Sequence, residues 1–229
     1  METKVTTTTA PSVKEELAAV AAPTQVTGIE GEIGNRDIQL PRLNLIQKMS
    51  DMVNAGFQPN TFVLNKEIPL GKTLEAVVVR LKKQFTQDLP YGTDVQPHTC
   101  DTIAEVREAG GSIEWGAENK YSEVAHMQLM VKAPDGLTEE QLDSFPYEVD
   151  GSHWAPCMFT AAKTAYKTSA KPVITAAFST LRQGLHHGLW SVTADLKSNP
   201  MGSWSVPQFK LTGRTKKEMA ELVEALNNG

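Results

Sequence analysis

The sequence is poor in the features that several large protein classes require. It has two cysteines in 229 residues, Cys100 and Cys157, which are too few for a disulfide framework and fit a reducing compartment. No window approaches the ~20 consecutive apolar residues of a membrane-spanning helix. The first residues lack the basic start and long apolar run of a secretion signal. These absences lead us to expect a cytoplasmic protein without a membrane segment.

The common catalytic motifs are also missing. There is no glycine loop followed by Lys-Ser/Thr for binding phosphates, no nucleophile elbow and no metalloprotease helix. Two His/Cys pairs could be combined into a zinc site, but the close cysteine pair of most zinc sites is absent. The residues of these pairs are His98, Cys100, His153 and Cys157. We therefore expect no metal, no other cofactor and no enzymatic activity.

Basic residues are unevenly distributed along the chain. The formal net charge is −5, yet residues 154–217 contain nine basic residues and one acid. Three of the four tryptophans, Trp154, Trp190 and Trp204, lie in the same stretch. Cations interleaved with aromatic rings suit single-stranded nucleic acid, because cations follow phosphates while rings stack on unpaired bases. The same composition also fits core aromatics beside a solvated row of lysines.

The composition divides the chain into three parts. Residues 1–36 contain no aromatic side chain and have the composition of a disordered tail. Residues 37–213 are expected to form one domain, with an excursion at residues 86–122 where prolines and glycines loosen the pattern. Residues 214–229 are expected to form an amphipathic helix. Its periodicity is equally consistent with packing on its own domain and with binding a second copy in a homo-oligomer.

The strongest strand signal lies at residues 73–85, which are β-branched in the middle. Strict alternation would place Arg80 and Lys82 in line with Ala76 and Val78. One face of this strand would then change from apolar to basic toward its end. That pattern is typical both of a solvated strand end and of a nucleic-acid groove.

The remaining elements complete a recognisable order. A helix is expected between the third and fourth strands, with one apolar face at Ile174, Ala177, Phe178 and Leu181. The order strand, strand, strand, helix, strand, strand is that of the OB barrel, which binds oligonucleotides. We predict an α+β fold that is mainly β: an OB-like β-barrel with this helix and a C-terminal amphipathic helix. The other strands are expected at residues 123–132, 153–160, 188–197 and 203–211, and the helix at residues 170–183.

Three stretches carry a resemblance to a known family. They are IQLPRLNLIQ, the long strand that ends in Arg80 and Lys82, and the run from TSAKPVITAAFSTLR to GLWSVTADLKSNPMGSWSVPQFKLTG. Together, over about residues 38–213, these resemble bacteriophage replication-region proteins regarded as single-stranded DNA-binding proteins. The resemblance implies an OB-type core that coats single strands during DNA replication or recombination, in the host cytoplasm and alongside replication or recombination proteins. The ending EMAELVEALNNG departs from the disordered acidic tip common in such proteins.

We therefore expect a nonenzymatic protein that binds single-stranded DNA with little sequence specificity. The helix-start lysines Lys163, Lys167 and Lys171 are expected to act together with Arg80 and Lys82. Cations would hold phosphates and rings would stack on bases. The full set of expected nucleic-acid-binding residues is Arg80, Lys82, Lys163, Tyr166, Lys167, Lys171, Trp190, Lys197, Trp204 and Lys210.

Other interpretations remain open at this point. The chain could be a structural or interaction protein, such as a virion component or a host-factor inhibitor, whose basic segment meets an acidic protein surface. A metal-dependent nucleic-acid enzyme is a weaker alternative. His186 and His187 are expected in an exposed turn, where they could also contact phosphate. The sequence does not separate DNA from RNA as the ligand.

Overall fold

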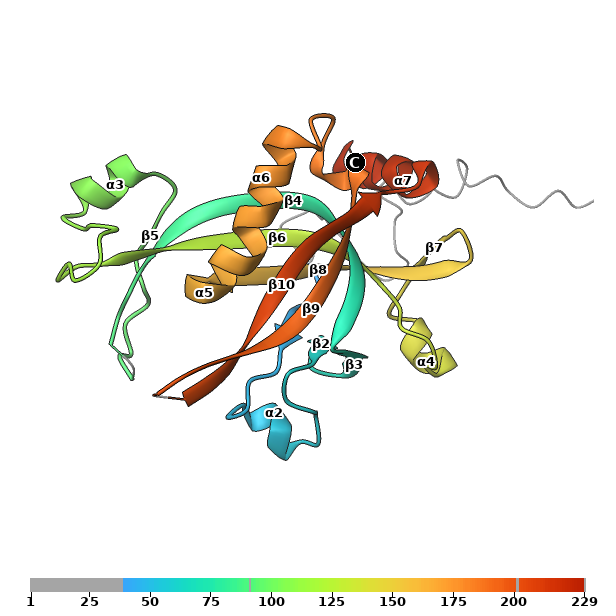
Figure 1. The fold of residues 1–229 in the computed structure, drawn as a ribbon, viewed down its shortest axis with the longest axis horizontal. Helices are drawn as coiled ribbons and strands as arrows, with labels where there is room; N and C mark the ends of the chain where they lie inside the picture. The colour runs from blue at the N-terminus through green and yellow to red at the C-terminus, as the bar shows by residue number, and fades with distance from the viewer. Residues whose placement is uncertain (1–38, 91, 201, 229) are drawn as a thin grey trace, which may run out of the picture. The chain divides into compact units, whose positions relative to one another are not determined.

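The structure is a computed structural model that describes residues 39–90, 92–200 and 202–228 (Figure 1). The tail predicted at residues 1–36 lies outside the described residues. The chain divides into two compact units. One is Gln39–Thr215, and the other holds the remaining residues, of which helix α7 (Lys217–Asn228) is described. None of the helices within the described ranges is long and apolar enough to cross a membrane.

The larger unit is built on an antiparallel sheet in the order β10-β9-β4-β6-β8-β7, with β5 beside β4. The long strand β4 pairs through its first residues with β9 and through the rest with β6. The predicted strands are confirmed, with most extending further than the sequence pattern indicated. The strands are β4 (Thr73–Gln87), β5 (Thr99–Cys100), β6 (Tyr121–Lys132), β7 (Tyr147–Val149), β8 (Ser152–Ala162), β9 (Gly188–Asn199) and β10 (Gly202–Arg214).

The sheet does not close into a barrel, which corrects that part of the prediction. Its ladder ends at β10 on one side and at β7 on the other, and no ladder joins β8 to β10 within the described residues. The mainly β, α+β class is as predicted. The sequence pattern could not settle closure, because closure depends on pairing between the two most distant strands of the ladder.

A short segment, residues 41–47, contacts both β8 and β10, which do not pair with each other over the residues described. The Met158 N–H of β8 donates a hydrogen bond to the Pro41 carbonyl, at 2.8 Å. The Gln47 side chain exchanges two hydrogen bonds with the backbone of Ser205 in β10, at 2.9 and 2.8 Å. Residues 41–47, the bridging segment, therefore satisfy backbone groups of both strands. This segment opens a second, three-stranded sheet: β1 (Leu43–Leu45), β2 (Phe62–Leu64) and β3 (Ile68–Gly71), with helix α2 (Asp51–Asn54) between β1 and β2.

One face of the large sheet, the inner face, carries the core. Alternate residues of each strand, such as Val78, Met127, Phe159, Trp190 and Phe209, are buried in one hydrophobic cluster. A helical segment crosses this face, as Figure 1 shows for α5 and α6. It consists of α5 (Lys163–Ala165), the π-helical turn η1 (Tyr166–Ala170) and α6 (Lys171–Ser179).

The helical segment differs from its prediction in both start and face. It begins at Lys163 rather than near residue 170. The predicted apolar face is confirmed only in part: Leu181 is buried and Ile174 packs against the core, whereas Phe178 is 81% exposed.

A β-bulge changes the orientation of β4 halfway along its length. Val78 lies opposite Leu129 and Arg80 lies opposite Gln128, so Val79 has no partner in the ladder. A bulge adds one residue to the alternation and reverses the side chains that follow it. Arg80 and Lys82 consequently point away from the inner face, and the predicted alignment with Ala76 and Val78 is wrong.

The predicted excursion runs between β4 and β6 and has its own small core. Phe85, Cys100, Val106 and Tyr121 form a separate buried cluster. Helix α3 (Ile103–Glu108) supplies Val106 and is capped by the Thr102 hydroxyl, which accepts from the Glu105 N–H. Two further short helices complete the unit, α4 (Glu139–Leu142) and the 3-10 turn η2 (Leu185–His187). His186 and His187 belong to this turn, and they are half-buried rather than exposed.

Candidate nucleic-acid interface

The side of the sheet opposite the inner face carries a set of polar residues in two rows. In the first row, Lys82 lies opposite His126, which lies opposite Thr160. In the second, Arg80 lies opposite Gln128, which lies opposite Met158. Side chains directly opposite each other in an antiparallel ladder share one face and lie close together. We call the polar members of these rows, with Gln84, the polar face: Arg80, Lys82, Gln84, His126, Gln128 and Thr160.

The polar face is positively charged and has one acid at its end. Arg80 is exposed and has no ion-pair partner among the residues described. Lys82 pairs with Asp101 at 3.1 Å, and Gln84 donates to the same carboxylate at 2.7 Å. These two interactions, that with Gln84 first, lower the pKa of Asp101. Because Lys82 and Asp101 are both more than half exposed, their ion pair is weak and phosphate could displace it.

His126 occupies the middle of the polar face. Its Nδ1 lies 3.2 Å from the Thr160 hydroxyl. Partial burial lowers its pKa, and the charge of Lys82 lowers it further. The ring is therefore mainly neutral at pH 7, and it offers one donor and one acceptor nitrogen to a ligand.

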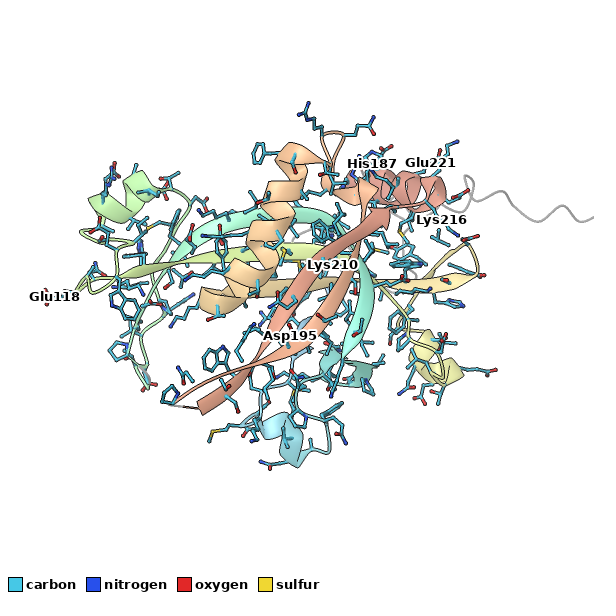
Figure 2. All side chains as sticks on the ribbon, in the orientation of Figure 1. Glu118, His187, Asp195, Lys210, Lys216 and Glu221 are labelled. Carbon is cyan, nitrogen blue, oxygen red and sulfur yellow. The ribbon has the colours of Figure 1, made fainter. Side chains whose placement is uncertain are left out.

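The β9–β10 hairpin places a tryptophan beside a lysine. Trp204 is half-buried and lies directly opposite Lys197, which is exposed. Lys210 is also exposed, opposite Ser191, and Figure 2 shows it on β10. This arrangement offers a ring face and a cation at neighbouring positions. Trp190 is not near Trp204, because its partner in the ladder is Leu211.

Two expected stacking residues are buried in the core and must be withdrawn from the site. Trp190 is 0% exposed and packs against Phe209, with ring centroids 6.3 Å apart. Tyr166 is 3% exposed, within the π turn. Trp190 lies on a strand and Tyr166 on a helical turn, and each of these elements has one buried and one exposed side. The sequence pattern does not determine whether a given aromatic side chain lies on the buried or the exposed side. Neither ring can stack on a base in this structure.

The helix-start lysines lie across the sheet from the polar face. The residue of β4 that faces the helical segment is Lys83, whose ammonium lies 5.7 Å from the Tyr166 ring centroid. Lys82 points to the opposite side. The structure therefore does not bring Lys163, Lys167 and Lys171 together with Arg80 and Lys82, as the sequence analysis had expected. Lys167 and Lys171 are exposed, without an ion-pair partner among the described residues.

Lys163 is held in a separate ionic cluster. Its ammonium lies 3.5 Å from Asp88, which also pairs with Lys120 at 3.4 Å and accepts a hydrogen bond from Ser122 at 2.7 Å. Lys163 has a positive φ of 53°, uncommon for a side chain of its size. The ion pair between Lys163 and Asp88 joins the start of α5 to the residue that follows β4.

Sequence reasoning missed the central residues of the polar face. His126, Gln128 and Thr160 lie outside any charge cluster, but their alternation on the predicted strands 123–132 and 153–160 was a usable signal. It also passed over Trp115, which is 93% exposed, with the Lys120 ammonium 4.7 Å from its ring centroid. Trp115 lies in the excursion, where no strand or helix pattern drew attention to it.

The zinc arrangement considered from sequence is not formed. His98 and Cys100 lie together in the excursion, where His98 Nδ1 is 3.0 Å from the Tyr121 hydroxyl and 3.5 Å from the Cys100 sulfur. Cys157 is fully buried in the inner face, and burial raises the pKa of its thiol well above the usual range. Within the described residues, the two His/Cys pairs do not meet in one ligand set.

Comparison with protein-family models, with curated proteins and with solved structures found no significant match to this chain.

Proposed function

We propose that this protein binds single-stranded DNA with little sequence specificity and acts, as a phage-type single-stranded DNA-binding protein, in DNA replication or recombination. The observation that carries the proposal is the polar face. Arg80 and Lys82 stand in register with Gln128 and His126 on the next strand, and the nearby acid, Asp101, lies at one end. Cations attract phosphates, while amide, imidazole and hydroxyl groups position the strand through hydrogen bonds.

The strand order supports the same proposal. The order β8-β6-β4-β9-β10, with a helical segment between β8 and β9, is the order of OB strands 3-2-1-4-5. In OB folds the second and third strands, with the loops after the first and fourth, bind oligonucleotides. The corresponding parts here are β6 and β8, the excursion, and the β9–β10 turn. In this interpretation, the bridging segment takes the place of direct pairing between the third and fifth OB strands.

The hairpin supplies the stacking component of the proposed site. Trp204 combines a partly exposed ring with the neighbouring charge of Lys197. Stacking on an aromatic ring holds any base, because every base has a π face, and this accounts for low sequence specificity. Lys167, Lys171 and Lys210 add long-range attraction for a polyanion without contacting bases.

A comparison of matched double variants tests the proposal. Anisotropy with single-stranded DNA, duplex DNA and RNA at two salt concentrations identifies the preferred polymer. Arg80→Ala/Lys82→Ala should weaken single-strand binding at least tenfold and reduce the salt slope by about 1.4, because two phosphate contacts are lost. Lys167→Ala/Lys171→Ala removes the same charge across the sheet and should have a smaller effect. Absence of single-strand binding at low salt would overturn the proposal.

A second function, contact with a protein partner, is favoured by the far end of the excursion. Trp115 is 93% and Ile113 41% exposed, and the carboxylates Glu114 and Glu118 stand beside them in the sequence (Figure 2 labels Glu118). The two carboxylates repel DNA but attract a basic protein surface, such as that of a replication or recombination protein. The exposed apolar side chains beside them would add a hydrophobic contact with that partner. Capture of a partner by the wild type, but not by Trp115→Ala, after nuclease treatment would support this function.

A further inference from the structure

An open pocket of about 350 Å³ lies where the bridging segment meets the turn between β2 and β3. Its polar lining consists of two cations and three side-chain amides, and none of its lining residues is acidic. Arg42 and Lys66 have no ion-pair partner among the described residues. The lining residues are Gln39, Leu40, Pro41, Arg42, Asn44, Asn65 and Lys66.

The backbone of this pocket is fixed by its own hydrogen bonds. Leu43 and Leu64 are partners in the β1–β2 ladder, which brings Arg42 opposite Asn65. The Arg42 carbonyl accepts from the Asn65 N–H at 2.8 Å and from the Asn44 side-chain amide at 3.2 Å. The backbone at the two cationic residues is therefore held in place before a ligand binds. A ligand would not have to order this part of the chain.

Lys66 occupies a conformation that disfavours lysine. Asn65 and Lys66 have φ values of 50° and 62°, and the Glu67 N–H donates to the Leu64 carbonyl across them. Two consecutive left-handed residues define the hairpin turn for which Asn-Gly is the preferred pair. Glycine would relieve the steric cost at the second position. A lysine there costs turn stability and places an ammonium group at the pocket.

The pocket continues one row of residues that includes the polar face. Arg42 forms a bridge with Met158, so the row Arg80, Gln128 and Met158 extends to the pocket. Three strand spacings separate Arg80 from Arg42, on the order of 14 Å. A single strand that crosses β4, β6 and β8 would therefore end near Arg42 and Lys66.

We propose that this pocket binds a phosphate group, and that its occupant is the terminal phosphate of a single strand lying on the polar face. The assignment to a terminal phosphate of a single strand rests on the proposed function, whereas phosphate binding by the pocket does not. A guanidinium group binds phosphate through two parallel hydrogen bonds, and an ammonium group adds a second charge. A terminal monoester carries about 1.5 to 2 negative charges at pH 7, so it suits two cations better than an internal diester does.

The test uses short oligonucleotides of one sequence with a 5′ phosphate, a 3′ phosphate or neither, measured by anisotropy against the full chain. One phosphorylated form should bind the wild type about tenfold more tightly than the unphosphorylated form. Lys66→Gly and Arg42→Ala should abolish that preference. Lys48→Ala removes an exposed cation outside the pocket and should retain it. Equal binding of all three oligonucleotides, or a preference that survives both pocket variants, would overturn the assignment to a terminal phosphate.

Lys66→Gly also separates loss of the ligand from loss of the fold. Because glycine is favoured at this position, the variant should unfold at the wild-type temperature or above it while losing the preference. A titration with inorganic phosphate, followed by the amide NMR signals of Asn65 and Lys66, tests the pocket without DNA. Saturable shifts that Arg42→Ala abolishes, in a protein that binds no oligonucleotide, would support the pocket and overturn the proposed function. No shift would overturn the pocket even if DNA binds.

Discussion

Lys82 and His126 lie directly opposite each other on β4 and β6, on the same side of the sheet. Partial burial and, secondarily, the Lys82 charge hold the His126 pKa below its ordinary value of 6.5. A phosphate beside these two residues would act in the opposite direction, because an anion favours the imidazolium form. The protonation of His126 is therefore a direct report on the polar face.

Lys82→Gln should raise the His126 pKa, and so should addition of single-stranded DNA to the wild type. Since binding favours the protonated ring, affinity should increase as pH falls through the pKa of the complex. In the protein without ligand, the pH dependence of folding stability has the opposite direction. The lowered His126 pKa means that the fold favours the neutral ring, so stability is lost as pH falls below 6.5. NMR titration of the imidazole measures both effects. Lys132→Gln, six positions along β6, should leave the pKa unchanged.

Substitutions of Trp204 and Trp115 should distinguish the proposed DNA contact from the proposed protein contact. Trp204→Ala should weaken single-strand binding by roughly five- to 150-fold, the range for loss of one stacked base, and should reduce fluorescence quenching by oligonucleotide. Trp115→Ala should preserve both affinity and quenching, because that ring stands among Glu114 and Glu118. If Trp115→Ala abolished binding instead, Trp115 at the far end of the excursion would be a DNA contact, and its assignment to a protein partner would be wrong.

Deletion of Val79 should leave Arg80 and Lys82 on the polar face. Removing the extra residue makes Val78–Leu129 and Arg80–Gln128 consecutive pairs of one regular ladder, so the alternation of side chains is kept on both sides. Loss of the buried Val79 side chain should destabilise the fold by about 1.5–3 kcal/mol. Circular dichroism during urea unfolding measures this loss, and deletion of Gly92, in the exposed part of the excursion, should cost less. Loss of single-strand binding in a folded Val79 deletion would contradict the register assigned to the bulge.

Asp88→Asn should cost about 1 kcal/mol at pH 7, because it weakens the interactions with Lys120 and Lys163. Burial would raise the pKa of Asp88, but the hydrogen bond from Ser122 and the two lysines outweigh it and hold the pKa below 3.8. The carboxylate therefore stabilises the fold above that pH, and its contribution is lost as pH falls through the lowered pKa. Urea unfolding between pH 7 and 3 should show a flatter acid dependence in Asp88→Asn than in Asp94→Asn, which removes an exposed carboxylate.

Much of the secondary structure was predictable, because it depends on local patterns. The strand at residues 73–85 has a β-branched centre, and the Asn199 to Gly202 turn has the residues that hairpins prefer. The bulge at Val79 was not predictable, because it shifts the pattern by a single residue. A shift of one residue is enough to reverse the side chains of a strand, so an error of face followed from a correctly predicted element.

The candidate site was predictable only in part for the same reason. Arg80 and Lys82 were identified from their charge, which does not depend on the face they occupy. Trp190 was misplaced, since an aromatic ring on a strand fits core and groove equally well. His126 was missed because its role comes from its position opposite Lys82, and pairing between β4 and β6 is a property of the tertiary fold.

The bridging segment also sets the order in which the chain can fold. Gln47 has to find Ser205, 158 residues further along, before the backbone groups that it satisfies are paired. Contacts between such distant residues make folding slow, on the order of milliseconds to seconds for β-rich topologies. During synthesis the bridging segment and β8 are complete long before β10 exists, so the edge that later meets Ser205 stays unpaired, and an unpaired edge recruits other chains. Yield of soluble protein should therefore depend on synthesis rate and temperature more steeply than equilibrium stability alone would suggest.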